Sequence, residues 1–209
     1  MDSPNHVDRR GFFRIGGLTI AAAVVFGACG DDEPATVAAQ QDEADPPVSR
    51  TDLNILRTVT SIELLAVDVY TQALAGSLVT TPSVSEAMKE FLKHHEAHAE
   101  LLQATTVKAG GEAFVQPNPA LVASLRPARA ALTTEAGVMA LALDIESVAA
   151  QTYQASVTSF TDKTLNRTAM SIGGIAARHV AVLRAASGQP AVTETFQTTP
   201  RAVSTSAGV

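Results

Sequence analysis

The feature that most constrains the fold of this 209-residue chain is a pattern of ionisable residues that occurs twice. Each copy has a glutamate after an isoleucine, a tyrosine seven residues later, and a histidine in the next apolar stretch. The two copies consist of Glu63, Tyr70 and His98, and of Glu146, Tyr153 and His179. Corresponding residues of the two copies lie 81 or 83 residues apart, and a repeat of this length predicts two copies of one helical hairpin. The repeated residues are also those that ligate metals.

Apolar periodicity and helix-ending residues predict four long helices. Their expected ranges are 51–75, 84–109, 135–160 and 163–186. The first and last pairs are joined by short loops, so each pair should form an antiparallel hairpin. The stretch 112–132 is longer and contains Pro117, Pro119 and Pro127, so it should cross the bundle and form a short helical turn after Asn118. The sequence therefore predicts an all-α four-helix bundle of two hairpins joined by a long crossover.

The repeated ionisable residues lie on the apolar seams of these helices, near their middles. At 3–4 spacing, Glu63 falls between Val59 and Ala66, and the stripe that carries His95 and His98 is otherwise apolar. Burying an unpaired polar group costs on the order of 2–7 kcal/mol. These side chains must therefore pair with one another or with a metal ion.

The N-terminal residues 1–28 have the composition of an export signal. Paired Arg9 and Arg10 resemble a twin-arginine signal, and an apolar run too short to span a bilayer comfortably follows them. The run ends at Cys29 in a sequence that resembles a bacterial lipobox, although Phe26 stands where an aliphatic residue is usual. We expect Cys29 to carry a lipid. The alternative is an ordinary cleaved signal in which Cys29 is incidental.

Composition limits the partners of the exported chain. Residues 29–50 are polar and lack an apolar period, which is typical of a disordered tether. The net charge of −6 argues against nucleic acid, so membrane contact should run through Cys29. A single cysteine excludes a disulfide within the chain. Homo-oligomers are compatible with the sequence. Residues 189–209 should form an irregular tail, with Val192 and Phe196 able to pack back on the core.

Residues 51–188 resemble the ferritin-like superfamily, in its exported bacterial branch. The two-iron sites of that family use one Glu on each of two helices and Glu-x-x-His on each of the other two. The resemblance assigns the lone-Glu places to Glu63 and Glu146, and the histidine places to His98 and His179. The remaining two glutamate places hold His95 and Ala176. This chain therefore departs from the family pattern at two of its carboxylates.

The resemblance implies a degenerate site. Glu63, Glu146, His98 and either His95 or His179 would hold at most one divalent ion, Fe, Mn or Zn, because a second ion would lack bridging charge. A metal-free hydrogen-bonded network is the other interpretation. Tyr70 and Tyr153 would donate hydrogen bonds to the ligands or simply fill the core.

Two functions remain open for a protein at the outer face of the cytoplasmic membrane. The first is a lipid-anchored ferritin-like domain that is non-catalytic and binds one divalent ion or none. The alternative is a redox or iron-handling protein of the ferroxidase or peroxide type, which would be a metal-dependent oxidoreductase. The two missing carboxylates favour the non-catalytic function, and the sequence also shows no nucleophile–base arrangement.

Overall fold

The computed structural model describes residues 49–205; the predicted signal, Cys29 and most of the predicted tether lie outside them. The described residues form helices and no strands, which confirms the all-α prediction. The helices are α1 (Arg50–Ala75), α2 (Pro82–Lys108), α3 (Pro119–Ala130), α4 (Glu135–Ser156) and α5 (Lys163–Ala186). Among them, none combines the length and the hydropathy needed to cross a bilayer.

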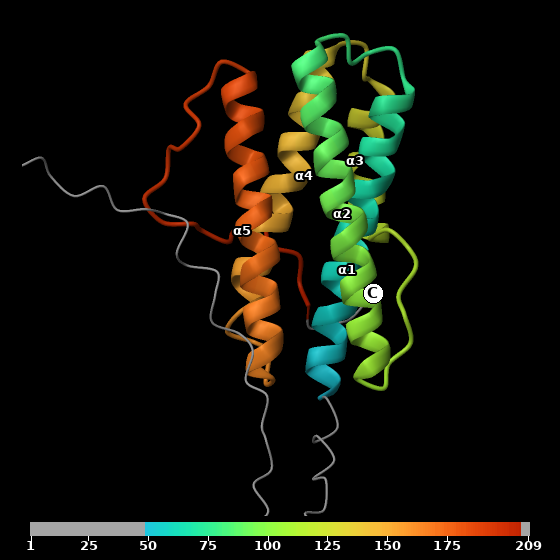
Figure 1. The fold of residues 1–209 in the computed structure, drawn as a ribbon, viewed down its shortest axis with the longest axis vertical. Coiled ribbons are helices and arrows are strands. Elements are labelled where there is room, and N and C mark those ends of the chain that lie inside the picture. The colour runs from blue at the N-terminus through green and yellow to red at the C-terminus, as the bar shows by residue number, and fades with distance from the viewer. Residues whose placement is uncertain (1–48, 206–209) are drawn as a thin grey trace, which may run out of the picture. The chain divides into compact units, whose positions relative to one another are not determined.

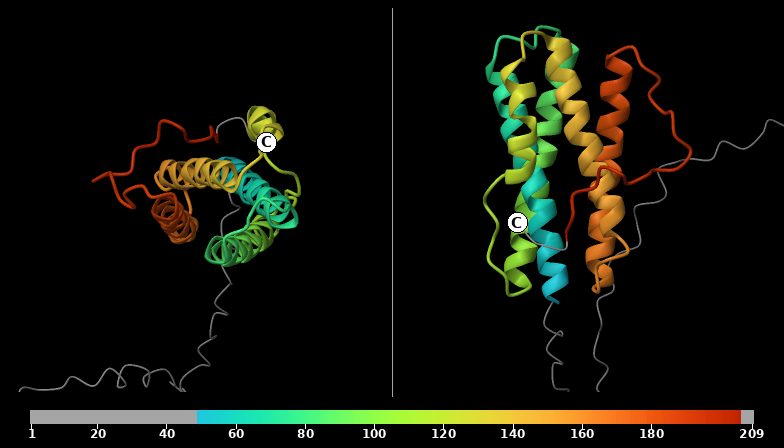
Figure 2. Two further views of the ribbon diagram at one scale, coloured as in Figure 1. Left: turned by 90° about the horizontal axis from the view of Figure 1, so that it is seen from above. Right: turned by 180° about the vertical axis from the view of Figure 1, so that it is seen from behind.

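The four long helices form two antiparallel hairpins, α1 with α2 and α4 with α5 (Figure 1). The hairpins meet mainly through α1 and α4, while α2 and α5 approach each other less closely, as the view along the bundle shows (Figure 2). The crossover between the hairpins contains α3, which is longer than the single turn expected. Asn118 caps α3 and its side-chain amide donates to Ser61 of α1, and Arg129 pairs with Asp68 of α1 at 2.9 Å. These contacts hold α3 against the outside of α1.

Two helix ends differ from the sequence-based prediction. Helix α2 begins two residues earlier, because Pro82 suits a first helical position and the Glu135 carboxylate accepts the Thr81 backbone N–H at 2.7 Å. Helix α4 ends at Ser156 and not at residue 160. The loop that follows it is organised by the buried Asp52 carboxylate, which accepts the Thr161 backbone N–H at 2.8 Å. Both differences come from contacts between residues far apart in the sequence.

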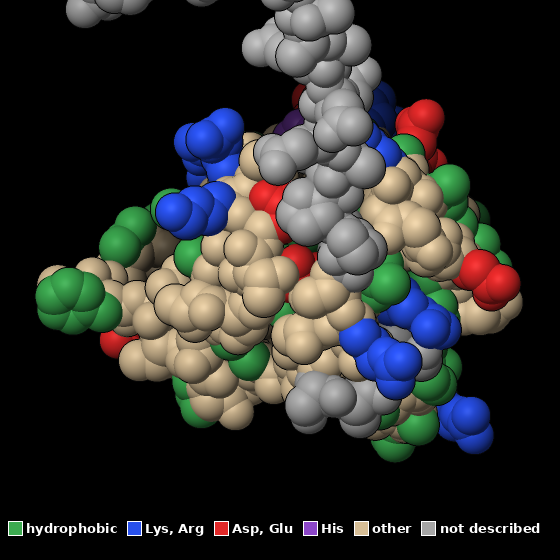
Figure 3. All heavy atoms as spheres, turned by 90° about the horizontal axis from the view of Figure 1, so that it is seen from below, with side chains coloured by type: hydrophobic (Ala, Val, Ile, Leu, Met, Phe, Trp, Pro, Cys, Tyr) green, Lys and Arg blue, Asp and Glu red, His purple; other side chains and the backbone are tan. Residues whose placement is uncertain are grey.

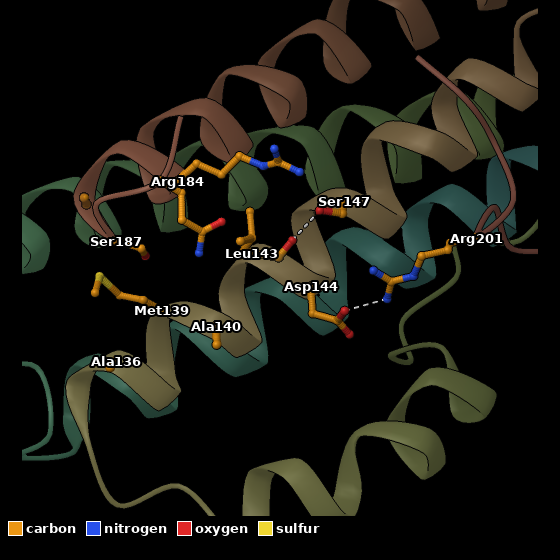
Figure 4. Close-up of a pocket in the computed structure, with 11 residues that line it drawn as sticks. Ala136, Met139, Ala140, Leu143, Asp144, Ser147, Arg184, Ser187 and Arg201 are labelled. Carbon is orange, nitrogen blue, oxygen red and sulfur yellow. Dashed lines mark hydrogen bonds and ion pairs between the residues drawn. The ribbon is translucent and has the colours of Figure 1, made fainter. Parts of the chain in front are cut away.

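The tail packs on the bundle, but not through the residues expected. Val192 and Phe196 are 78% and 80% exposed. Instead, the Arg201 backbone N–H donates to the Gln151 side chain at 2.9 Å, and its guanidinium pairs with Asp144 at 2.6 Å. The tail thereby walls a hollow of about 630 Å³ against α4 and the end of α5 (Figure 4). Polar side chains of α4 hold the tail, and Val203 packs on the apolar cluster beside them.

The core has two larger apolar clusters with a layer of ionisable side chains between them along the bundle, and a smaller third cluster of Ile62, Ala149, Ala150 and Ala176. The first cluster includes Tyr70, Met88, Phe91, Ile145 and Leu183. The second includes Ile55, Val59, Leu102, Tyr153 and Ile172. Along each long helix the glutamate or histidine of the repeat falls between the residues of the two clusters. Water is thus kept from the ionisable layer by apolar side chains on both sides.

The charged side chains of the bundle's end face are arranged differently from those in the core. On the end that carries the start of α1 and of α5, Lys and Arg side chains stand at separate places around the rim, with neutral surface and acidic side chains between them (Figure 3). This distribution is that of a solvated face. The ionisable side chains that must find partners within the protein are those of the buried layer.

Two neighbouring glycines of α5 give a test of how closely α5 packs against α4. A Cβ on Gly173 would lie 2.7 Å from the Tyr153 Cβ, whereas one on Gly174 would meet nothing within 4 Å. Gly173→Ala should lower the free energy of unfolding by about 1–3 kcal/mol, because it forces the buried Tyr153 to move. Gly174→Ala is the matched control and should raise it by up to about 1 kcal/mol through helix propensity. Urea unfolding of both variants measures this, and equal effects would contradict the close packing.

Candidate metal centre

The residues predicted from the repeat converge in the ionisable layer. Glu63 comes from α1, His95 and His98 from α2, Glu146 from α4 and His179 from α5. Glu63, His95, Glu146 and His179 are at most 2% exposed, and the His98 side chain is 16% exposed. Each lies near the middle of its helix, so no helix end or loop contributes to the cluster. The backbone positions of the ligating groups are therefore fixed by the packing of the bundle.

His95 occupies the centre of the cluster and joins the two carboxylates. Its Nδ1 lies 2.7 Å from Glu63 Oε2, and its Nε2 lies 2.8 Å from Glu146 Oε1. A carboxylate oxygen only accepts, so both ring nitrogens donate and the ring is an imidazolium. One positive charge thus lies between two buried negative charges. Helix α2 supplies the counter-charge for α1 and for α4 at the same time.

The two tyrosines of the repeat each donate to the glutamate of the other copy. The Tyr70 hydroxyl lies 2.7 Å from Glu146 Oε1, and the Tyr153 hydroxyl lies 2.6 Å from Glu63 Oε1. Both rings also belong to the apolar clusters, so they fill the core and orient the carboxylates together. Burial and the adjacent carboxylates raise the pKa of both tyrosines well above their usual range, which keeps the hydroxyls protonated as donors.

The remaining histidines lie at the edges of the cluster. His98 Nδ1 donates to Glu63 Oε2 at 3.3 Å, and His179 Nδ1 donates to Glu146 Oε1 at 3.1 Å. His94, which is not among the candidate ligands that the sequence indicates, belongs here too, because its Nδ1 is 3.0 Å from His179 Nε2. A sequence clue to His94 existed: it lies one turn before His98 on the same face of the helix.

The charge states follow from burial and pairing. Burial alone would raise the pKa of Glu63 and Glu146, but the positive His95 and the histidine hydrogen bonds outweigh it and lower both to about 2. Burial alone would lower the pKa of His95, but the two carboxylates outweigh it and raise that pKa to about 10. At neutral pH Glu63 and Glu146 are therefore carboxylates and His95 is an imidazolium.

The cluster provides two overlapping sets of ligands. The first is Glu63, His95 and His98; the second is His95, Glu146 and His179. In each, the candidate ligand atoms lie within 4.8 Å of one another. Glu146 Oε2 is buried and accepts no hydrogen bond, so an oxygen is available beside the second set. These donors fit one divalent ion. They do not fit two, because Ala176 is buried among Ile62, Ala149 and Ala150 and supplies no oxygen.

Residues 51–189 match the family model described as the ferritin-like domain. The search of curated proteins found none that matches. The family match covers the five helices, apart from Arg50 at the start of α1, and every residue of the cluster.

Replacing the central histidine should strongly destabilise the protein. His95→Gln leaves two buried carboxylates without a cation, and at pH 6 we expect it to lower the free energy of unfolding by about 3–5 kcal/mol. His98→Gln is the matched control and should cost less, because His98 is partly exposed and makes one longer hydrogen bond to Glu63. Urea unfolding of the metal-free proteins measures both. Equal losses would contradict a central role for His95.

The same variant should also change the pH dependence of stability. In the metal-free wild type, the lowered carboxyl pKa values contribute stability that is lost as pH falls from 4.5 toward 2. The raised pKa of His95 contributes stability that is lost as pH rises from 6.5 toward 10. Stability should therefore be greatest between these ranges. In His95→Gln the carboxyl groups are buried without a cation, so its stability should increase as pH falls from 7 to 5.

Proposed function

Because the chain belongs to the ferritin-like domain family, we propose that it is an exported, lipid-anchored member whose degenerate centre binds at most one divalent metal ion and catalyses no reaction. The observation that carries the proposal is the His95 bridge between Glu63 and Glu146, with Glu146 Oε2 unpaired beside it. The three histidines and two carboxylates suit Fe, Mn or Zn. A bound ion would supply the positive charge that the His95 proton supplies without it.

Charge counting supports a limit of one ion. With His95 protonated, the two carboxylates leave the cluster with one net negative charge. One divalent ion held with neutral His95 makes the cluster neutral, because a ligating imidazole must give up its proton. A second divalent ion would leave two uncompensated positive charges between apolar clusters, which is costly. This cluster therefore lacks the carboxylates that a two-ion oxidase centre would need.

Metal titration tests this proposal. The wild type should bind one Mn²⁺ or Zn²⁺ per chain and release protons, which calorimetry in two buffers of different ionisation enthalpy detects. Affinity should rise with pH, because binding competes with the His95 proton. Tight binding of two ions would contradict the one-ion centre. No binding at any pH would leave the cluster as a metal-free network that stabilises the bundle.

Restoring a carboxylate should strengthen binding. Ala176→Glu places a carboxylate one turn before His179, where the family pattern has one. We expect it to bind Mn²⁺ more tightly and, when metal-free, to unfold more easily, because it buries another acid. The variant that combines Ala176→Glu with His95→Glu should bind Mn²⁺ more tightly still and, when metal-free, unfold more easily still. Ala177→Glu makes the same change at an exposed neighbouring position and is the matched control. No gain in a folded Ala176→Glu protein would contradict the assignment of this position.

The anchor is tested separately. The sequence that ends at Cys29 and the polar stretch after it support a lipid at the cysteine. Cys29→Ser removes the thiol that would carry the lipid, so the protein should move from the membrane fraction to the soluble fraction. Immunoblots of the fractions measure this, with the wild type alongside. Unchanged membrane association of the variant would contradict lipid anchoring.

A further inference from the structure

His94 links the buried centre to solvent. Its side chain is 40% exposed, whereas that of His179 beside it is 3% exposed and that of Glu146 is fully buried. The three side chains form a line from the surface inward, His94 to His179 to Glu146, with contacts of 3.0 and 3.1 Å. A cation that reaches the buried carboxylates along this line meets His94 first.

His179 presents its two ring nitrogens to different neighbours. Nδ1 donates to Glu146, so in the neutral ring Nε2 accepts from the Nδ1–H of His94. The two rings are stacked and nearly parallel, with an interplanar angle of 2°. Their nitrogens share a proton at 3.0 Å, and an ion at the usual metal–nitrogen distance of about 2.0–2.1 Å would have to displace that proton and part the rings. His94 can therefore offer its nitrogen to a cation before the cation reaches His179.

An acidic side chain lies on the outer side of His94. Glu90, one turn earlier on α2, has its Oε1 3.7 Å from His94 Nε2. It also pairs with Lys93 at 3.0 Å, but both side chains are more than half exposed, and such pairs are weak and easily exchanged. Glu90 thus places a mobile negative charge next to the outermost imidazole, where it attracts divalent cations from solution.

We propose that His94, assisted by Glu90, is an outer capture position for a divalent cation on its way to the buried centre. This inference rests on the proposed metal-binding function. A capture position speeds the arrival of the ion and also its departure, because the same group serves both directions. It should therefore change the rates of loading more than the equilibrium affinity. A ligand of the buried centre would change the affinity itself.

Stopped-flow loading of the metal-free protein with Co²⁺ tests the proposal, because bound Co²⁺ absorbs visible light. The variant His94→Gln should slow loading by about tenfold, the low end of the effect of removing one group beside a metal. Removal of Co²⁺ by excess chelator should slow by a similar factor, so the dissociation constant changes little. Glu90→Gln should slow loading less, because its charge is screened by solvent. Glu96→Gln, an exposed glutamate elsewhere on α2, is the matched control and should load at the wild-type rate.

The outcomes separate this proposal from the proposed function. If the wild type binds Co²⁺ and His94→Gln loads at an unchanged rate, only the capture position is refuted. If His94→Gln weakens the affinity by speeding release, His94 is a ligand of the centre and the capture role is wrong. If the wild type binds no Co²⁺, Mn²⁺ or Zn²⁺, the cluster is a metal-free network, and both metal binding and the capture position are refuted.

Discussion

The imidazolium of His95 between Glu63 and Glu146 is the interaction on which the rest of the structure depends. Two carboxylates in an apolar core are expensive unless a cation lies within hydrogen-bonding distance of both. One side chain of α2 meets that need for α1 and for α4, with contacts of 2.7 and 2.8 Å. The three helices are thereby held in one register, because sliding any of them would leave a buried charge unpaired. The apolar clusters on either side keep the local dielectric low. They therefore increase both the cost of leaving a charge unpaired and the strength of the contacts between His95 and the two carboxylates.

The sequence predicted the bundle and the members of the cluster, but not how they are connected. Helical periodicity tells which face of a helix a residue occupies, so Glu63 and Glu146 could be placed on the seams. It does not tell which of two histidines reaches the middle, and the bridging position of His95 follows from how α2 approaches the other helices. His94 was missed for the same reason, since its partner His179 lies on another hairpin. The domain limits and the metal-ligating roles remain predictions.

The errors about the loops and tail have a common physical cause. Val192 and Phe196 are apolar and could have packed on the core, yet both are exposed. The tail instead satisfies polar groups of α4: Gln151 accepts from the Arg201 backbone, and the Thr152 hydroxyl accepts from the Val203 backbone at 3.0 Å. Polar groups that are buried must find partners wherever the chain can reach. No local pattern shows which distant segment will supply them.

The same bridge that stabilises the metal-free protein opposes metal binding. An ion can use a His95 nitrogen only after the proton held by two carboxylates has left, so each gain in the stability of the bridge is a loss in metal affinity. The asymmetry of the repeat determines this balance: one copy has His95, and the other has Ala176 at the corresponding position. Glutamates at both positions would favour bound metal and leave the empty bundle strained by repulsion. With His95 and Ala176, the His95 proton balances one of the two carboxylate charges, and an ion that ligates His95 would bind only in exchange for that proton.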